Sequence, residues 1–143
     1  ITLNAIDNNQ YNVDIDEVSL KTEIITRVLG CKVNISCIFV SESTIKEINI
    51  NLLSKNKVTN VISLRKRKYK NCYFGEIYLC LDFIVNEANE LNNTLMEHLM
   101  HLIIHGILHI LGWKHEFKHD EMKMKKKENL LMKEIGYPLP WEI

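Results

Sequence analysis

The stretch LMEHLMHLIIHGILHILGWKH, residues 95–115, combines a long apolar run with several histidines and two glycines. Thr94 and Glu97 form the T-x-x-E pattern of a capping box, which predicts that a helix begins there. From Leu95 to Leu111 apolar residues lie nearly all round the helix, so we expect it to be buried at the centre of the fold.

The segments before this helix alternate between strand and helix patterns. Strands are predicted where apolar and polar residues alternate, and helices where apolar residues recur at helical spacing. The predicted order is strand 1–6, helix 14–30, strand 32–40, helix from 41, strand 61–64, strand 71–81 and a short helix over 82–91. This βαβαββ order followed by helices predicts an α+β fold, a small mixed sheet packed with about five helices, in one domain over residues 1–143.

Residues 118–128, KHDEMKMKKKE, are rich in charge and are predicted to form the outer face of a final helix. Apolar residues near helical spacing are predicted to form its inner face. They are Phe117, Met124, Leu130, Leu131 and Ile135.

Overall composition excludes some classes of protein. Lysine plus arginine and aspartate plus glutamate number 18 each, so net charge alone predicts no polyanionic partner. The four cysteines, Cys31, Cys37, Cys72 and Cys80, have no two-residue spacing and are predicted to be reduced and packed as small apolar residues.

No leader pattern and no apolar run of about 20 residues is present, which favours a cytoplasmic protein without a membrane partner. An organelle and a leader removed before Ile1 both stay open.

Three histidines have the spacing of a metal site. His105 and His109 are four residues apart, so a helix places both rings on one face, one turn apart. His115 would point away if the helix continued, but Gly112 is suited to end the helix and turn the chain back. Gly106 is expected to leave the wall open beside His105. Three imidazoles with a fourth position left for water are typical of a catalytic zinc site, so we predict one metal ion there.

The remaining histidines have other predicted roles. His98 is expected to be structural or on the surface, and His119 to be solvated. His101 lies one turn before His105 and is a candidate to orient a ligand or a water molecule.

The spacing H-x-x-x-H-x-x-G-x-x-H also occurs in metzincin zinc proteases. Those enzymes carry a glutamate general base directly after the first histidine. Here that position is Gly106, which cannot accept a proton, so a zinc peptidase is the least favoured alternative.

A different family matches more of the chain. HLIIHGILHILGWKH, residues 101–115, resembles the H-G-x-L-H-L-x-G-x-D-H signature of the YbeY family of metal-dependent endoribonucleases. Three shorter segments, TNVIS at 59–63, GEI at 75–77 and IGYPLP at 135–140, resemble other family segments in the same order.

The resemblance implies a hydrolase specific for single-stranded RNA, with one Zn²⁺ bound by His105, His109 and His115. It also implies a role in maturing the 3′ end of 16S ribosomal RNA of the small subunit and in ribosome quality control. The expected chemistry is metal-assisted phosphodiester hydrolysis, in which zinc lowers the pKa of bound water toward about 7. No residue of the chain is assigned as general base.

Two positions depart from the family pattern: Lys114 replaces an aspartate and Leu53 replaces an arginine. These changes favour, as the alternative, a metal-binding ribosome assembly factor with weak catalysis. Lys55 lies near Leu53 and is a candidate to supply the positive charge.

The basic stretch RKRKYK, residues 65–70, is predicted as a loop between two strands that contacts RNA. Its cations would pair with phosphates and Tyr69 would stack on a base, although a merely solvated loop is equally compatible. The candidate RNA contacts are Lys55, Arg65, Lys66, Arg67 and Lys68.

Overall fold

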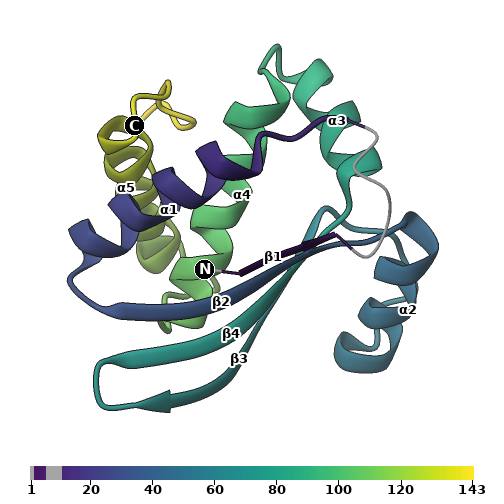
Figure 1. Ribbon diagram of the computed structural model, residues 1–143, viewed down its shortest axis with the longest axis horizontal. Coiled ribbons are helices and arrows are strands. Elements are labelled where there is room, and N and C mark those ends of the chain that lie inside the picture. Colours follow the sequence, from purple (N-terminus) through teal and green to yellow (C-terminus); the bar gives the residue numbers. More distant parts are fainter. Residues whose placement is uncertain (1, 6–10) are drawn as a thin grey trace.

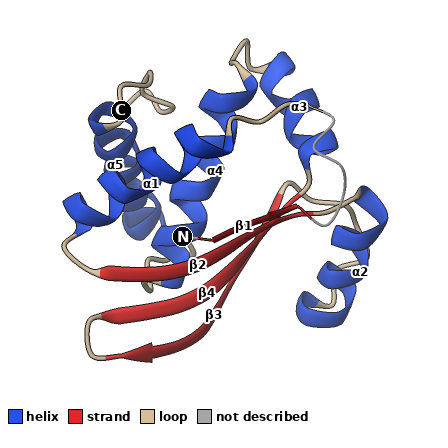
Figure 2. Cartoon of the chain, viewed as in Figure 1, coloured by secondary structure: helices blue, strands red, loops and turns tan. Residues whose placement is uncertain are grey.

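The computed structural model describes residues 2–5 and 11–143, which form four strands and five helices. In chain order these are β1 (Thr2–Ala5), α1 (Ile15–Leu29), β2 (Lys32–Phe39), α2 (Glu42–Leu53), β3 (Val61–Tyr69), β4 (Cys72–Leu79), α3 (Leu81–Glu90), α4 (Leu95–Ile110) and α5 (Lys118–Glu134). Figures 1 and 2 show one sheet with most of the helices gathered on one side. The predicted α+β fold with a mixed sheet and about five helices is confirmed. Ile1 and Ile6, at the ends of the predicted first strand, lie outside the described residues.

The sheet has the strand order β1-β2-β4-β3. β1 and β4 both run parallel to β2, whereas β3 and β4 form an antiparallel hairpin. The register of β2 and β4 pairs Lys32 with Cys72 at one end and Phe39 with Leu79 at the other. Because side chains alternate between the faces of a strand, successive residues of β2 and β4 contribute to two different cores.

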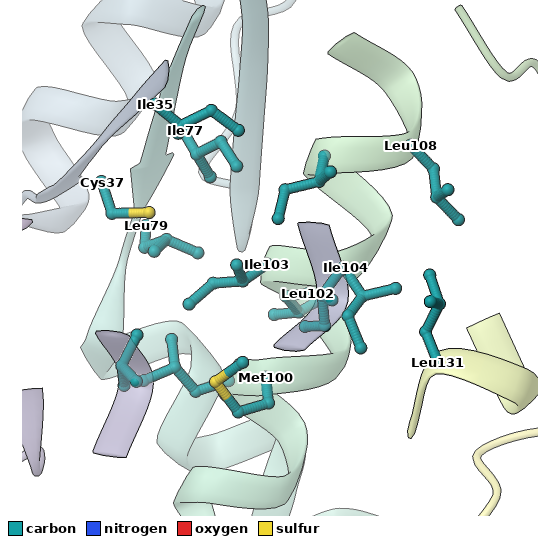
Figure 3. Close-up of a cluster of buried hydrophobic side chains, with 14 of the residues drawn as sticks. Ile35, Cys37, Ile77, Leu79, Met100, Leu102, Ile103, Ile104, Leu108 and Leu131 are labelled. Carbon is teal, nitrogen blue, oxygen red and sulfur yellow. The ribbon is translucent and has the colours of Figure 1, made fainter. Parts of the chain in front are cut away.

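The larger core lies between the sheet and helices α1, α3, α4 and α5. Figure 3 shows side chains of β2 and β4 facing α4 on one side, with Leu131 of α5 approaching α4 from the other. Ile103, Ile104 and Ile107 of α4 are fully buried. Each such side chain contributes about 1.5–3 kcal/mol through its burial, so α4 is the element around which the fold is organised. The smaller core, which includes Ile38, Ile45 and Ile62, lies between α2 and the opposite face of the sheet.

Two glycines allow α4 to approach β4 closely. A Cβ atom on Gly75 would lie 2.7 Å from the Ile110 side chain and 2.7 Å from the Leu64 carbonyl oxygen. A Cβ atom on Gly106 would lie 2.9 Å from the Ile77 side chain. Gly106 therefore faces the sheet, and the prediction that it opens the wall beside His105 is wrong, because its free space is filled by Ile77.

Replacing Gly75 with alanine is expected to lower the free energy of unfolding by about 1–3 kcal/mol, as overpacking does in other cores. The obstacle includes backbone of β3, which cannot move aside cheaply. The Gly106→Ala variant provides the comparison, because its added Cβ meets side-chain atoms of Ile77 and no backbone atom, and because it gains helix propensity. Urea unfolding of both variants measures the difference, and equal stabilities would contradict this account of the α4–β4 packing.

Three sequence predictions need correction. The basic stretch from Arg65 to Tyr69 is not a loop but the second half of β3, paired with β4 through an irregularity between Arg65 and Arg67. Strand pairing continues because Tyr73 and Phe74 of β4 supply apolar partners for these basic residues.

On α5, the predicted inner-face residues Phe117 and Leu130 are instead 70% and 46% exposed. Phe117 precedes the first turn of the helix, and Leu130 lies on its outer side. The other three, Met124, Leu131 and Ile135, are buried as predicted.

All four cysteines are free. Cys37 and Cys80 are buried, and burial raises the pKa of the Cys37 thiol to about 12, so Cys37 behaves as a small apolar residue. Cys31 and Cys72 are only partly buried. Among the described residues, no helix has both the length and the apolar character needed to cross a bilayer.

Candidate metal centre

Helix α4 begins with the predicted capping box. The Thr94 hydroxyl accepts from the Glu97 backbone N–H at 3.1 Å, and the Glu97 carboxylate accepts from the Thr94 backbone N–H at 3.2 Å. These two bonds satisfy backbone donors at the helix start and fix where α4 begins. The phase of the helix then directs His101 and His105 toward α5 and the C-terminal segment, while His109 faces the turn that follows α4.

The end of α4 is built as the spacing predicted. Gly112 has a φ of 102°, and its N–H bonds to the His109 carbonyl at 3.0 Å. The Trp113 N–H bonds to the Leu108 carbonyl at 2.9 Å, which completes a Schellman motif. This turn reverses the chain and returns His115 to the face that carries His105 and His109.

The same turn orients His109. Its Nδ1 lies 3.0 Å from the Trp113 carbonyl oxygen. A carbonyl only accepts, so Nδ1 carries the hydrogen and Nε2 keeps its lone pair. The turn that ends the helix therefore also selects the tautomer of its last histidine.

Glu128 of α5 orients His105. Its carboxylate lies 2.7 Å from His105 Nδ1 through Oε2, while Oε1 accepts from His101 Nε2 at 2.6 Å and Trp141 Nε1 at 2.7 Å. Burial alone would raise the pKa of Glu128, which is 1% exposed, but bonds from His101, His105 and Trp141 outweigh it and lower the pKa to about 2. The ionised carboxylate only accepts, so Nδ1 of His105 carries a hydrogen, and in the neutral ring this tautomer leaves the lone pair on Nε2.

The three histidines of the predicted site lie together. The Nε2 atoms of His105 and His109 are 2.9 Å apart, and the donor atoms of all three rings lie within 4.8 Å of one another. Burial of His109, followed by the effect of its neighbours His105 and His115, lowers the pKa of its imidazole. Because both Nδ1 atoms face oxygen acceptors, the two Nε2 atoms face each other, an arrangement that a shared cation stabilises.

The chemistry of this donor set fits a metal ion. Three imidazole nitrogens suit zinc and other late first-row metals, with ligand bonds of about 2.0–2.1 Å for zinc. The donor atoms lie up to 4.8 Å apart, which is slightly more than the combined length of two zinc–nitrogen bonds. His115 is the exposed member of the cluster. The ring with most freedom to rotate is therefore the one that must close the remaining distance.

Two cavities adjoin the cluster. One of about 270 Å³ is lined by His105, His115, Lys125 and Trp141 among others. The other, of about 480 Å³, shares His105 and Trp141 with it and extends toward α3 and the start of β3. The histidine nitrogens therefore lie beside space that can admit a substrate, rather than in a closed structural site.

Comparison with known proteins identifies the family. The chain matches the family described as Endoribonuclease YbeY over residues 4–136. The chain belongs to the YbeY family. It is 38% identical over 108 residues to Endoribonuclease YbeY of Ehrlichia canis (strain Jake). The aligned residues cover 75% of this chain and 70% of that protein. It is 33% identical to Endoribonuclease YbeY of Buchnera aphidicola subsp. Acyrthosiphon pisum (strain APS), covering 96% of this chain and 95% of that one.

A solved structure agrees with this assignment. The solution structure of a protein from Thermotoga maritima superposes with a TM-score of 0.68 at 28% sequence identity, covering 94% of this chain and 89% of that one. The YbeY relatives named above are bacterial proteins.

The other histidines of this YbeY chain occupy distinct environments. His98 is 5% exposed and its Nε2 bonds to Glu87 at 3.1 Å, while its Nδ1 has no partner among the described residues. His101 contacts the same carboxylate that holds His105, which is the orienting position expected for it. His119 is exposed at the start of α5, as predicted.

The predicted RNA-contacting side chains of β3 are exposed, but each already contacts another group of the protein. Arg65 Nε donates to the Ile110 carbonyl at 2.7 Å, where a cation stabilises the C-terminal end of α4. Lys66 pairs with Glu76 at 2.8 Å, and Arg67 and Lys68 lie over the rings of Phe74 and Tyr73. The structure therefore spreads them along β3, whereas Lys55 is exposed after α2.

The two departures from the YbeY pattern are both on the surface. Lys114 lines a separate cavity with Gly112, Trp113, Asp120 and Lys123, not the two cavities beside the histidines. Leu53, the last residue of α2, is 47% exposed. Neither side chain takes part in holding the three rings.

Sequence reasoning missed Glu128, Lys125 and Trp141. Glu128 was placed within the charged outer face of the last helix, yet it is spaced four and three residues from the buried Met124 and Leu131. That spacing places a carboxylate on the inner face of α5, which is the signal that was available. No comparable pattern pointed to Trp141, which packs beside His101 with ring centroids 5.6 Å apart.

Proposed function

We propose that this chain is a zinc-dependent endoribonuclease that cleaves single-stranded RNA, acting as one YbeY-like domain over residues 1–143. The observation that carries the proposal is the triad His105, His109 and His115, in which the Nε2 atoms of two rings face each other and the donor atoms of all three lie within 4.8 Å of one another. The triad adjoins open cavities, as a catalytic metal site requires.

Zinc is the proposed metal because all three donors are imidazoles, with no thiolate and no carboxylate among them. When bound, one zinc ion supplies Lewis-acid chemistry, lowering the pKa of water and polarising a phosphate oxygen. The chain holds the ligands in place through the Trp113 carbonyl and Glu128. We assign no protein base, because the nearby carboxylate of Glu128 already accepts from three donors.

Lys125 is the one lysine or arginine among the described residues that line the two cavities beside the triad. It lines the 270 Å³ cavity with His105 and His115, pairs with Glu121 at 3.0 Å and lies over the Trp141 ring. We propose that it attracts the RNA phosphate toward the triad, since an ammonium group in a partly enclosed site acts over a distance with little screening.

The basic residues of β3, together with Lys55, are proposed to bind the RNA backbone away from the reaction centre. Because Arg65 and Lys66 also stabilise the fold, the test uses Arg67 and Lys68. Replacing both with glutamine is expected to weaken RNA binding several-fold and to reduce the slope of log K against log salt by about 1–2. Filter binding at several salt concentrations measures the slope, and an unchanged slope would leave these side chains as solvated surface.

In the cell, we propose a cytoplasmic role in maturing the 3′ end of 16S ribosomal RNA in the small subunit and in ribosome quality control. The support is membership of the YbeY family and the resemblance of the histidine signature. The alternative is a metal-binding assembly factor with weak catalysis, which rests on Lys114 and Leu53 standing where the family pattern has aspartate and arginine.

A single assay separates the candidate activities. Purified nuclease-free protein is incubated with ribosomal RNA and with casein, each with and without chelator. Chelator-sensitive cuts in RNA are expected, with no proteolysis because Gly106 occupies the position of a peptidase base and faces Ile77. Bound zinc with neither activity would favour the assembly factor, and RNA cleavage that survives complete metal removal would overturn the proposed mechanism.

A further inference from the structure

The 480 Å³ cavity beside His105 has the size of a small-molecule site and a polarity unlike that of a phosphate site. Leu91, Leu102 and Leu139 supply apolar wall, and Trp141 closes the side next to the triad. No lysine or arginine is among the described residues that line the cavity, whereas Glu87 is. A phosphate would be repelled here, but a neutral heterocycle would not.

Glu87 offers a free acceptor to an occupant of this cavity. Its Oε1 accepts from Asn60 Nδ2 at 2.9 Å and from His98 Nε2 at 3.1 Å. No described residue donates to Oε2. Two neighbours therefore hold the carboxylate in place, and one of its oxygens is left to receive a further donor.

The cavity adjoins the proposed reaction centre. His105 and Trp141 line both this cavity and the smaller one that contains Lys125 and His115. A nucleotide whose phosphate lies at the histidines would thus have its base within reach of Glu87. The smaller cavity offers the Lys125 ammonium and the histidines to a phosphate, and the larger one offers apolar walls and the Glu87 carboxylate to a neutral base.

We propose that this cavity binds the nucleobase of an RNA nucleotide next to the cleaved phosphate, and that Glu87 selects a base with an exocyclic amino group. The inference rests on the proposed endoribonuclease function and deepens it by naming a base preference. Carboxylates accept hydrogen bonds from the N4 amino group of cytosine, whereas uracil presents a carbonyl oxygen at that position. Glu87 is therefore a specificity-determining residue.

The test compares cytidine with uridine, two nucleosides of nearly equal size that lack phosphate. Metal-free full-length protein is titrated with each, and the side-chain signals of Asn60, Asn93 and Trp141 are followed by ¹⁵N NMR. Cytidine is expected to shift these signals and to bind about tenfold more tightly than uridine, the effect of one hydrogen bond to a charged group.

The Glu87→Gln variant keeps an acceptor for Asn60 and His98 but presents an amide N–H₂ in place of Oε2. It is expected to lose the preference for cytidine. The matched control is Glu90→Gln, on the same helix but exposed and outside the cavity, and should keep the preference. A second variant, Leu91→Trp, narrows the cavity from an exposed position and should weaken both nucleosides without disturbing the core.

Equal affinity for the two nucleosides, or shifts confined to residues outside the cavity, would overturn the proposal. So would a Glu87→Gln variant that is folded and prefers cytidine as strongly as Glu90→Gln. Because the assay uses metal-free protein and no cleavage readout, it is independent of the endoribonuclease assay. A protein that binds cytidine here yet never cuts RNA would contradict the proposed function and not the base site.

Discussion

Replacing His109 with alanine is expected to abolish stoichiometric zinc binding and to lower the rate of RNA cleavage by more than about 100-fold. His109 contributes one of the two Nε2 atoms that lie 2.9 Å apart, and its ring is held by the Trp113 carbonyl, so no neighbouring side chain can replace it. Changes that only reorient a metal ligand already cost about 10–100-fold, and loss of a ligand should cost more.

Elemental analysis of the purified variant measures zinc, and a gel assay on ribosomal RNA measures cleavage. The control is His119→Ala, because His119 is exposed on α5 and outside the triad. We expect that variant to match the parent protein in both readouts. A His109→Ala protein with one zinc per chain would contradict the assignment of the ligands.

Replacing Glu128 with glutamine is expected to lower zinc affinity by about 10–100-fold although the side chain keeps its size. The glutamine oxygen would face His101 and Trp141, which together provide two donors, and its N–H₂ group would face His105 Nδ1. His105 would then accept at Nδ1 and carry its hydrogen on Nε2, the atom that the metal requires.

A competition titration with a zinc-binding dye measures the affinity of this variant. Glu134→Gln, an exposed change in the last turn of the same helix, is the matched control and should leave the affinity unchanged. If Glu128→Gln binds zinc as tightly as the control, the carboxylate does not select the tautomer of His105. Circular dichroism establishes that both variants are folded.

Much of the fold follows from local patterns in the sequence. The capping box at Thr94, the apolar run of α4 and the stop at Gly112 each act within a few residues, and all three appear where they were predicted. The approach of His115 to His105 and His109 also follows, since it depends only on the helical repeat and the position of one turn.

What escaped prediction depends on partners distant in the chain. The strand character of Arg65–Tyr69 comes from pairing with β4, which outweighs the unfavourable local density of charge. Gly106 was predicted to leave space beside His105 because the two are adjacent in sequence. In the structure it instead provides room for Ile77 at the contact between α4 and β4. Glu128 and Trp141 converge on His101 only once α5 and the segment after it have packed against α4.

The central claim is that His105, His109 and His115 bind one metal ion and leave a coordination position for solvent. A crystal structure of the zinc-loaded protein, with anomalous scattering recorded at the zinc absorption edge, tests it most directly. We predict a single zinc peak within about 2.0–2.1 Å of one nitrogen from each ring, with water as the only other ligand. A peak elsewhere, rings that face apart, or a fourth protein side chain in the remaining position would contradict the account.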